Sequence, residues 1–285
     1  MKKPQVIGLG AAIIIGFAYV GAKMYASSIA EEKIDLAIAN LVNYVDVDYG
    51  NVSVDLLGFD VHVSDIVISP VSSEEKINID EIVVFDINKE SDMPFSLHIA
   101  LNGIQIPIDQ IEAVKKLGYN DHMLLNADID YEYNKNEKEI VLNKIQLGAE
   151  EVGDIALSFR LSNIDLNPKN VLALLFSYPQ IILHNATIMY RDDSLIDRLI
   201  KFQAEDQGLE VAQMKGHAIA GIENAIAVEE DEFTKGVLTE IKKFVNSPEE
   251  ISISIRPSKP LPFGRIMRIE TPKDLITALN LKIES

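Results

Sequence analysis

Residues 61–68 read VHVSDIVI, and this bent alternation decides the fold. Apolar side chains occupy positions 61, 63, 66 and 68, and the polar pair between them shifts the phase of the alternation by one residue. Alternation with a period of two predicts a β-strand with one apolar face. The same form recurs as INIDEIVV (77–84), IALNGIQI (99–106), IVLNKIQL (140–147), FRLSNIDL (159–166) and, more weakly, IILHNATI (181–188).

The polar pair would turn the apolar side chains of a regular strand to its opposite face. Two devices absorb such a shift: a β-bulge with one extra residue, or a corner at which the chain passes from one packed sheet to another. The copies mostly start near 20 residues apart, which fits two strands and their turns. We therefore predict a curved antiparallel sheet built of hairpin repeats. Its concave face is either a filled core or a groove for a hydrophobic ligand.

Helical patterns follow the strands. The stretch 192–207 reads DDSLIDRLIKFQAEDQ and has one apolar side, with Asp192, Asp193 or Ser194 as its cap. Two further helices are expected after Gly208, a strand at 251–256 and a last helix at 272–279. Helices after a run of strands predict an α+β fold in which the helices close the sheet. The expected parts are a β-rich repeat domain at 46–190, a helical segment at 191–250 and a closing segment at 251–285.

The N-terminal sequence predicts a membrane anchor. Residues 6–22 read VIGLGAAIIIGFAYVGA without a charge, and Lys2, Lys3 and Lys23 flank them. With its neighbours this run approaches the roughly 20 residues that span a bilayer as a helix. The leading lysines predict a cytoplasmic N-terminus and an exported bulk. We expect a single-pass inner-membrane anchor at 1–30, a helical stalk at 31–45 and the rest in the periplasm. The anchor's apolar residues are Val6, Ile7, Ile13, Ile14, Ile15, Phe17 and Val20. The alternative is a signal peptide that is cleaved after residues 28–30 (SIA).

The composition and the absence of known motifs disfavour several classes of function. The chain has 285 residues, 44 acidic against 26 basic side chains and no Cys. The acidic balance disfavours nucleic-acid binding, and the missing thiols exclude disulfides and Cys-ligated metals. No G-x-S-x-G, P-loop or H-E-x-x-H motif occurs, and the five His are scattered. Asp128, Asp130 and Glu132 share one face of a strand, where we expect solvent. We predict no catalytic residue, no metal site and no cofactor.

One stretch is basic. Residues 251–269 read ISISIRPSKPLPFGRIMRI and contain no acid. We call its four cations, Arg256, Lys259, Arg265 and Arg268, the basic strip. They are candidates for contact with anionic lipid headgroups or an acidic partner. The alternative is that they pair with acidic side chains of their own domain.

Taken together, these features resemble a known group of proteins. The stretch YGNVSVDLLGFDVHVSDIVISP (49–70) behind an apolar N-terminus is similar to AsmA-like and YdgA-like exported bacterial proteins. Three later stretches are similar to an uncharacterised bacterial envelope family: YRDDSLIDRLIKFQAEDQG (190–208), ISISIRPSKPLPFG and TPKDLITALNLKI. The resemblance implies a membrane-anchored periplasmic protein with lipid-related or envelope-maintenance duties.

The functional prediction is a non-catalytic, membrane-anchored exported domain that binds a lipid or another apolar ligand. The alternative is a structural subunit that docks other envelope proteins through its acidic surface. An enzyme would need acid and base groups that meet from distant strands.

Overall fold

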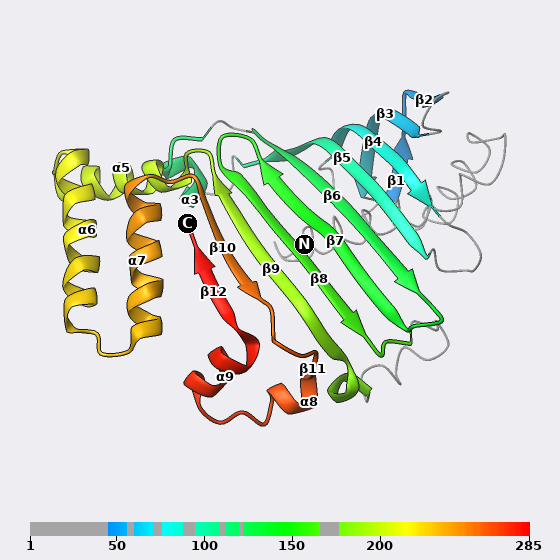
Figure 1. Cartoon of the computed structure of the whole chain (residues 1–285). Helices are drawn as coiled ribbons and strands as arrows, with labels where there is room; N and C mark the ends of the chain where they lie inside the picture. The colour runs from blue at the N-terminus through cyan, green and yellow to red at the C-terminus, as the bar shows by residue number, and fades with distance from the viewer. Residues whose placement is uncertain are drawn as a thin grey trace. The chain divides into compact units, whose positions relative to one another are not determined.

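The computed structural model describes residues 45–55, 60–70, 76–87, 95–108, 112–119, 122–165 and 177–285. Contacts divide the chain into two compact units. Unit 1 comprises Met1–Ile106 and Leu124–Lys135, and unit 2 comprises Pro107–Met123 and Asn136–Ser285. Figure 1 labels the elements of both units.

Unit 1 is built of antiparallel strands in the order β1-β3-β4-β5-β6, and β2 also pairs with β3. β1 and β2 pair with β3 in one register, so they act as a single strand that is interrupted at Tyr49 and Gly50. The strands are β1 (Val45–Asp48), β2 (Asn51–Val54), β3 (Val61–Pro70), β4 (Ile77–Ile87), β5 (Ser96–Pro107) and β6 (His122–Asn134).

In unit 1 the polar pairs of neighbouring strands lie opposite one another. The register between β3 and β4 is the same on both sides of Asp65, and that between β4 and β5 is the same on both sides of Gly103. Asp65 and Gly103 have positive φ, at 57° and 66°. A Cβ at Gly103 would overlap the carboxylate of Asp80, so this position needs glycine. The phase therefore reverses along one line across the strands, without any change of register.

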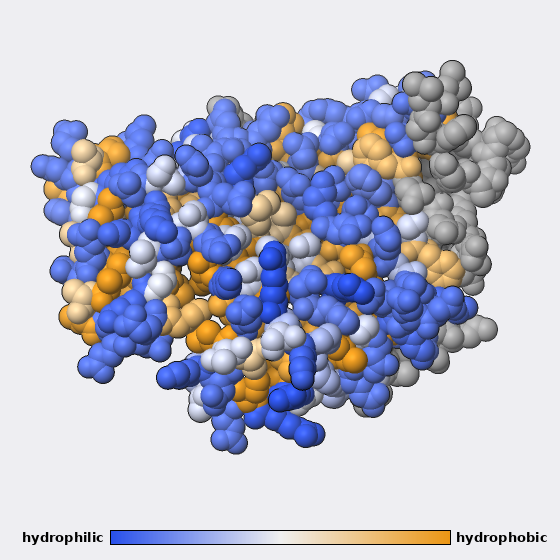
Figure 2. Space-filling view, in the orientation of Figure 1, coloured by the Kyte–Doolittle hydropathy of each residue, from blue (hydrophilic) through white to orange (hydrophobic). Residues whose placement is uncertain are grey.

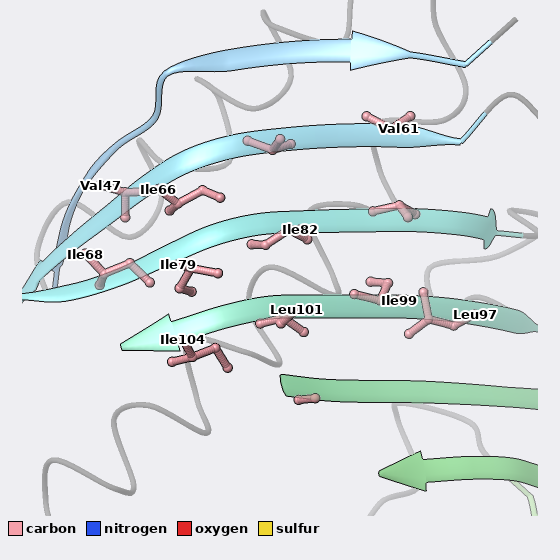
Figure 3. Close-up of a cluster of buried hydrophobic side chains, with 13 residues drawn as sticks. Val47, Val61, Ile66, Ile68, Ile79, Ile82, Leu97, Ile99, Leu101 and Ile104 are labelled. Atoms are coloured by element: carbon pink, nitrogen blue, oxygen red, sulfur yellow. The ribbon is translucent and has the colours of Figure 1, made fainter. Parts of the chain in front are cut away.

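This shared reversal keeps the apolar side chains together. Residues before and after the polar pairs join one buried cluster, with exposed fractions between 1% and 8%. Figure 3 shows these side chains lying across neighbouring strands. The cluster consists of Val47, Val61, Val63, Ile66, Ile68, Ile79, Ile82, Val84, Leu97, Ile99, Leu101, Ile104 and Ala127.

Unit 2 has antiparallel strands in the order β7-β8-β9-β10-β12, and β11 pairs with β9. Its strands are β7 (Glu139–Ala149), β8 (Gly153–Ser162), β9 (Ile182–Asp192), β10 (Glu250–Ile255), β11 (Leu261–Pro262) and β12 (Leu281–Glu284). Its helices are α3 (Glu112–Lys116), α5 (Leu195–Gln207), α6 (Val211–Val228), α7 (Glu232–Asn246), α8 (Phe263–Ile266) and α9 (Pro272–Leu279), with the 3₁₀ turn η2 (Tyr178–Gln180).

Two of the three polar pairs of unit 2, those of β7 and β9, form true bulges. Leu142 of β7 pairs with Phe159 and Ile145 pairs with Leu157, so two residues of β7 oppose one of β8. His184 is the extra residue of β9, because the register to β8 shifts there. The pair of the fifth copy lies elsewhere: β8 ends at Ser162, and Asn163 follows with a φ of 62°. Of the two devices predicted for the phase shift, the bulge occurs at β7 and β9 of unit 2. The polar pairs of unit 1 instead lie opposite one another in neighbouring strands of one sheet, an arrangement that was not predicted.

Local sequence sets the ends of the helices. α5 stops at Gly208 and α9 at Asn280, both in the left-handed conformation that ends helices. Asp231 caps α7 by accepting from the Thr234 backbone N–H at 2.9 Å. Thr271 caps α9 in the same way, at 3.2 Å from the Asp274 nitrogen.

The fold class predicted from the sequence, an α+β fold led by a transmembrane helix, is wrong. The described residues form a β-rich structure with twelve antiparallel strands and six α-helices. None of the helices in these residues is long and apolar enough to cross a membrane. The 18-residue α6, for instance, carries Lys215 and Glu223 within its length.

The same finding contradicts the predicted location, a single-pass inner-membrane protein with its bulk in the periplasm. The longer helices that the structure describes, α5, α6 and α7, all carry charged side chains within their length. The predicted anchor and its residues Val6, Ile7, Ile13, Ile14, Ile15, Phe17 and Val20 lie outside the described residues. Of the predicted stalk only Val45 is described, and it begins β1.

Candidate functional site

One face of the sheet in unit 2 carries apolar residues in three rows. Directly paired residues of neighbouring strands point to the same face, so the register identifies each row. The first row is Leu147, Ile155, Tyr190 and Ile251. The middle row is Ile145, Leu157, Ile188, Ile253 and Ile283. The third row is Leu142, Phe159, Ala186, Ile255 and Leu281. We call these three rows the apolar face.

The opposite face of the same strands is mainly polar. Thr187 pairs with Ser158 and Ser254, and Ser254 pairs in turn with Lys282. Arg191 pairs with Asp154 in the ladder, and their side chains form an ion pair. Hydrophilic residues predominate over β8 and β9 on the side that is turned to the viewer in Figure 2. The sheet of unit 2 is therefore amphipathic, with a sharp division between its faces.

The first and middle rows of the apolar face are partly open. Five of its residues are among the most exposed large hydrophobic side chains of the described residues: Ile145 41%, Leu147 45%, Ile155 49%, Ile188 46% and Ile253 40%. Covering a half-exposed aliphatic side chain is worth about 1 kcal/mol. Five such side chains on adjoining strands therefore leave several kcal/mol of hydrophobic stabilisation available to whatever covers them.

Helices contact the two outer rows of this face. At the third row, Phe263, Ile266 and Leu275 of α8 and α9 pack around buried Leu183, Leu261 and Leu279, in a cluster that also contains Ala186, Ile255 and Leu281. At the first row, the ring of Phe244 on α7 meets that of Tyr190 edge-on, with centroids 6.0 Å apart. The middle row lies between these two borders.

Tyr190 and Asp192 form a junction at the end of β9. The Tyr190 hydroxyl donates to Asp192 Oδ1 at 2.7 Å, and the Ile196 backbone N–H donates to the same oxygen at 3.2 Å. Asp192 is buried, and it satisfies one of the free N–H groups in the first turn of α5. Burial, followed by the neighbouring Asp192, raises the pKa of Tyr190 well above the ordinary value for tyrosine. This tyrosine stays protonated near neutral pH and acts as a donor.

Arg198 completes the junction from α5. Its guanidinium donates to Ser194 Oγ at 2.9 Å, to the Gly118 carbonyl at 2.7 Å and to Glu151 Oε2 at 2.8 Å. It also lies 4.2 Å from the ring centre of Tyr119, in a cation–π contact. These contacts join α5 to the segment after α3 and to the β7–β8 turn. The junction holds α5 in position, and the polar groups of Tyr190, Asp192 and Arg198 make the hydrogen bonds that hold it.

The basic strip borders the apolar face. Arg265 belongs to α8, whose Phe263 and Ile266 join the cluster at the third row. Arg256 directly follows Ile255 of that row, at the end of β10, and the alternation of the strand assigns it to the opposite face. All four cations are exposed. Within the part of the chain that the structure describes, none of the four side chains forms an ion pair. The internal pairing considered from the sequence is thus not seen for these residues.

Histidines and acids of the strands form local pairs. His62 contacts Glu81 at 2.8 Å, and this hydrogen bond lowers the pKa of Glu81. His98 lies 3.4 Å from Asp128, and His184 Nε2 lies 2.8 Å from Ser162 Oγ. The described residues contain no group of three metal-ligating side chains.

The sequence pointed to the basic strip and to an apolar sheet face that is either a core or a groove, but it missed the junction. For the junction a signal existed: Tyr190 and Asp192 stand two apart on a strand, immediately before a helix start. For the apolar face, the alternation was visible, but its exposure was not.

Comparisons with known proteins find two similarities, both to proteins described as uncharacterised. A family model described as "Uncharacterized protein" matches residues 146–285, which lie within unit 2. A protein of Aquifex aeolicus (strain VF5), also described as "Uncharacterized protein", is 24% identical over 306 residues, which cover 100% of this chain and 99% of that protein. No solved structure matches the chain. The resemblance to AsmA-like proteins stays a prediction.

Proposed function

We propose that the protein is a non-catalytic binding module that holds an apolar ligand of the lipid class on the apolar face of unit 2. The observation that carries the proposal is the set of five aliphatic side chains exposed by 40–49% on adjoining strands of one sheet face. Contiguous apolar surface of this kind is characteristic of binding sites for apolar ligands or partners.

The composition of the face favours an aliphatic ligand. The exposed members are Ile and Leu, and the aromatic Tyr190 stands at the border against Phe244. The middle row crosses five strands, which is about 19 Å at the usual spacing between strands. A long acyl chain can lie against such a row and cover several side chains at once, which makes the hydrophobic gain cooperative within one ligand.

The neighbouring polar groups support binding rather than catalysis. The strongest perturbation of a titratable group in unit 2 is that of Tyr190, and its hydroxyl is engaged by Asp192 in the junction. Asp192, in turn, holds the first turn of α5. The face therefore offers a surface with fixed borders, which is what a preorganised binding site requires.

Displacement of a fluorescent probe tests the proposal. The purified full chain is loaded with 1-anilinonaphthalene-8-sulfonate, and oleate is titrated in. We expect oleate to displace the probe from the wild-type protein. Ile188→Asp should bind oleate at least about tenfold more weakly, because a carboxylate would be covered by the acyl chain.

The matched control is Thr187→Asp, which introduces the same carboxylate on the same strand but on the polar face. It should bind oleate like the wild type. The proposal is overturned if the wild-type protein binds no oleate, or if the two variants lose affinity equally. If the face instead binds another protein, oleate will not displace the probe, and this result also overturns the proposal.

A further inference from the structure

We propose that the ligand is an anionic phospholipid, whose acyl chains lie on the apolar face and whose phosphate contacts the basic strip. This inference rests on the proposed function and deepens it. Its first support is charge. The stretch 251–269 contains four cations and no acid, in a chain with a formal net charge of −18. Such a local reversal attracts an anion to one border of an otherwise acidic protein.

The ladder brings the cations to one end of the sheet. Ile255, next to Arg256, pairs with Ala186 of β9, and Leu261 pairs with Leu183 of the same strand. These two attachment points on β9 are about 10 Å apart along the strand. The loop that carries Lys259 therefore leaves β10 and returns to β9 at the same end. Figure 1 shows β11, α8 and α9 together beside these ends of β9 and β10.

Backbone hydrogen bonds fix the positions of three residues of the basic strip. Arg268 donates its backbone N–H to the Arg265 carbonyl at 3.1 Å, so the two residues are one turn apart. At Arg256 the backbone is held on both sides: its N–H donates to the Leu279 carbonyl at 3.0 Å, and its carbonyl accepts from the Asn280 side chain at 3.0 Å. The backbone of the strip is thus fixed, and its exposed side chains, which form no ion pair within the described residues, are available to an anion.

The same elements connect the charge to the apolar face. Phe263 and Ile266 of α8 pack in the cluster that holds Ile255 and Leu281 of the third row, while Arg265 lies between them in sequence and is exposed. The border formed by α8 at the third row therefore carries an exposed cation, Arg265, next to buried apolar side chains. A phosphate group offers several acceptor oxygens, which several guanidinium and ammonium groups can share, and Arg is well suited to this geometry. An apolar surface that ends in unpaired cations complements a molecule with an acyl tail and a phosphate head.

Extraction of lipid from vesicles tests the inference. The full chain is incubated with vesicles of phosphatidylcholine that contain either fluorescent phosphatidylglycerol or fluorescent phosphatidylcholine, and the lipid bound to the separated protein is measured. We expect the wild-type protein to take up phosphatidylglycerol about tenfold more than phosphatidylcholine at low salt. The double variant Arg265→Glu with Arg268→Glu should lose this preference, because like charges now face the phosphate.

The control is Lys201→Glu with Lys282→Glu, which changes the net charge by the same amount. Lys201 is exposed on α5, and Lys282 lies on the polar face of β12. This control should keep most of the preference, whereas Ile188→Asp should lose uptake of both lipids. An equal loss in the control and in the Arg265 and Arg268 variant would overturn the inference.

The outcomes separate this inference from the proposed function. Equal uptake of both phospholipids that depends on Ile188, or binding of oleate without uptake of any phospholipid, would overturn the headgroup assignment and leave the binding face in place. Absence of oleate binding and of lipid uptake would overturn both.

Discussion

The two units use the same bent strand and reach opposite results. In unit 1 the polar pairs are aligned across strands, and the apolar side chains form a cluster with exposed fractions of 1–8%. In unit 2 two of the three pairs are single-residue bulges, and five apolar side chains remain 40–49% exposed. The comparison teaches that apolar alternation fixes which face is apolar, whereas burial depends on what packs against it. Unit 1 therefore buries its apolar face, and unit 2 leaves part of its apolar face exposed.

The largest expected effect comes from truncating the core of unit 1. Leu101→Ala removes a side chain that is 1% exposed and should cost about 2–5 kcal/mol of unfolding free energy. Ile188→Ala in unit 2 should cost less than about 1 kcal/mol, because that side chain is half exposed already. Denaturant unfolding of both variants measures the difference, and equal costs would remove the contrast between the units.

The aligned reversal in unit 1 depends on glycine. Gly103→Ala should destabilise unit 1 by about 2 kcal/mol, because φ is 66° and the added Cβ would overlap Asp80. Gly221→Ala in α6 is the matched change, since nothing lies within 4 Å of its Cβ position and alanine favours a helix. Thermal unfolding should show a loss for the first variant and no loss for the second. Tolerance of Gly103→Ala would argue against the strained reversal.

The junction that borders the open face predicts a pH dependence. Tyr190→Phe should cost about 1 kcal/mol at pH 8, because it deletes the hydrogen bond to Asp192. The pKa of Tyr190 is raised in the folded protein, so its contribution is complete below pH 10 and declines as the pH rises above 10. The difference in stability between the wild type and Tyr190→Phe should therefore shrink from pH 8 to pH 11.

Tyr178→Phe, a change at a tyrosine that is 43% exposed, serves as the control and should show no such change in difference. A difference for Tyr190→Phe that stays constant across this range would contradict the assignment of Tyr190 as a protonated donor.

The smallest effect is expected on the open face itself. Ile253→Thr keeps a β-branched residue on an exposed position and should change the unfolding free energy by no more than about 0.5 kcal/mol. It should nevertheless weaken binding of oleate by a few fold. Circular dichroism melting and probe displacement measure the two quantities, and a large loss of stability would mean that the face is part of a packed core.

Much of the strand arrangement could be predicted from the sequence, because alternation is a local property. Copies of the bent pattern lie on β3, β4, β5, β7 and β9. The choice between a bulge and an aligned reversal could not be predicted. The outcome depends on whether the partner strand has its own irregularity at the same place. In unit 1, Gly103 of β5 provides one opposite Asp80 of β4. In unit 2, Ser158 of β8 provides none opposite Asn143 and Lys144 of β7, so β7 forms a bulge. The predicted fold class was wrong in its membrane helix, because none of the described helices is long and apolar enough to cross a membrane.

The candidate site was accessible to sequence reasoning only in part. The basic strip is visible as a run without acids, but its place beside the third row follows from the pairing of Ile255 with Ala186. Ile188 ends its copy of the pattern as Val84 ends another, yet Ile188 is 46% exposed and Val84 is 2% exposed. That difference arises from packing between segments distant in sequence, which no local pattern records.

Reaction of single cysteines tests the contrast most directly, and it is clean because the chain has no natural Cys. Ile188→Cys and Leu101→Cys are made separately in the full chain, and their reaction with a thiol reagent is followed under native conditions. We predict that Ile188→Cys reacts rapidly and is protected by oleate, whereas Leu101→Cys reacts only as fast as unit 1 opens. If Ile188→Cys without ligand is as protected as Leu101→Cys, the apolar face of unit 2 is closed and the account is contradicted.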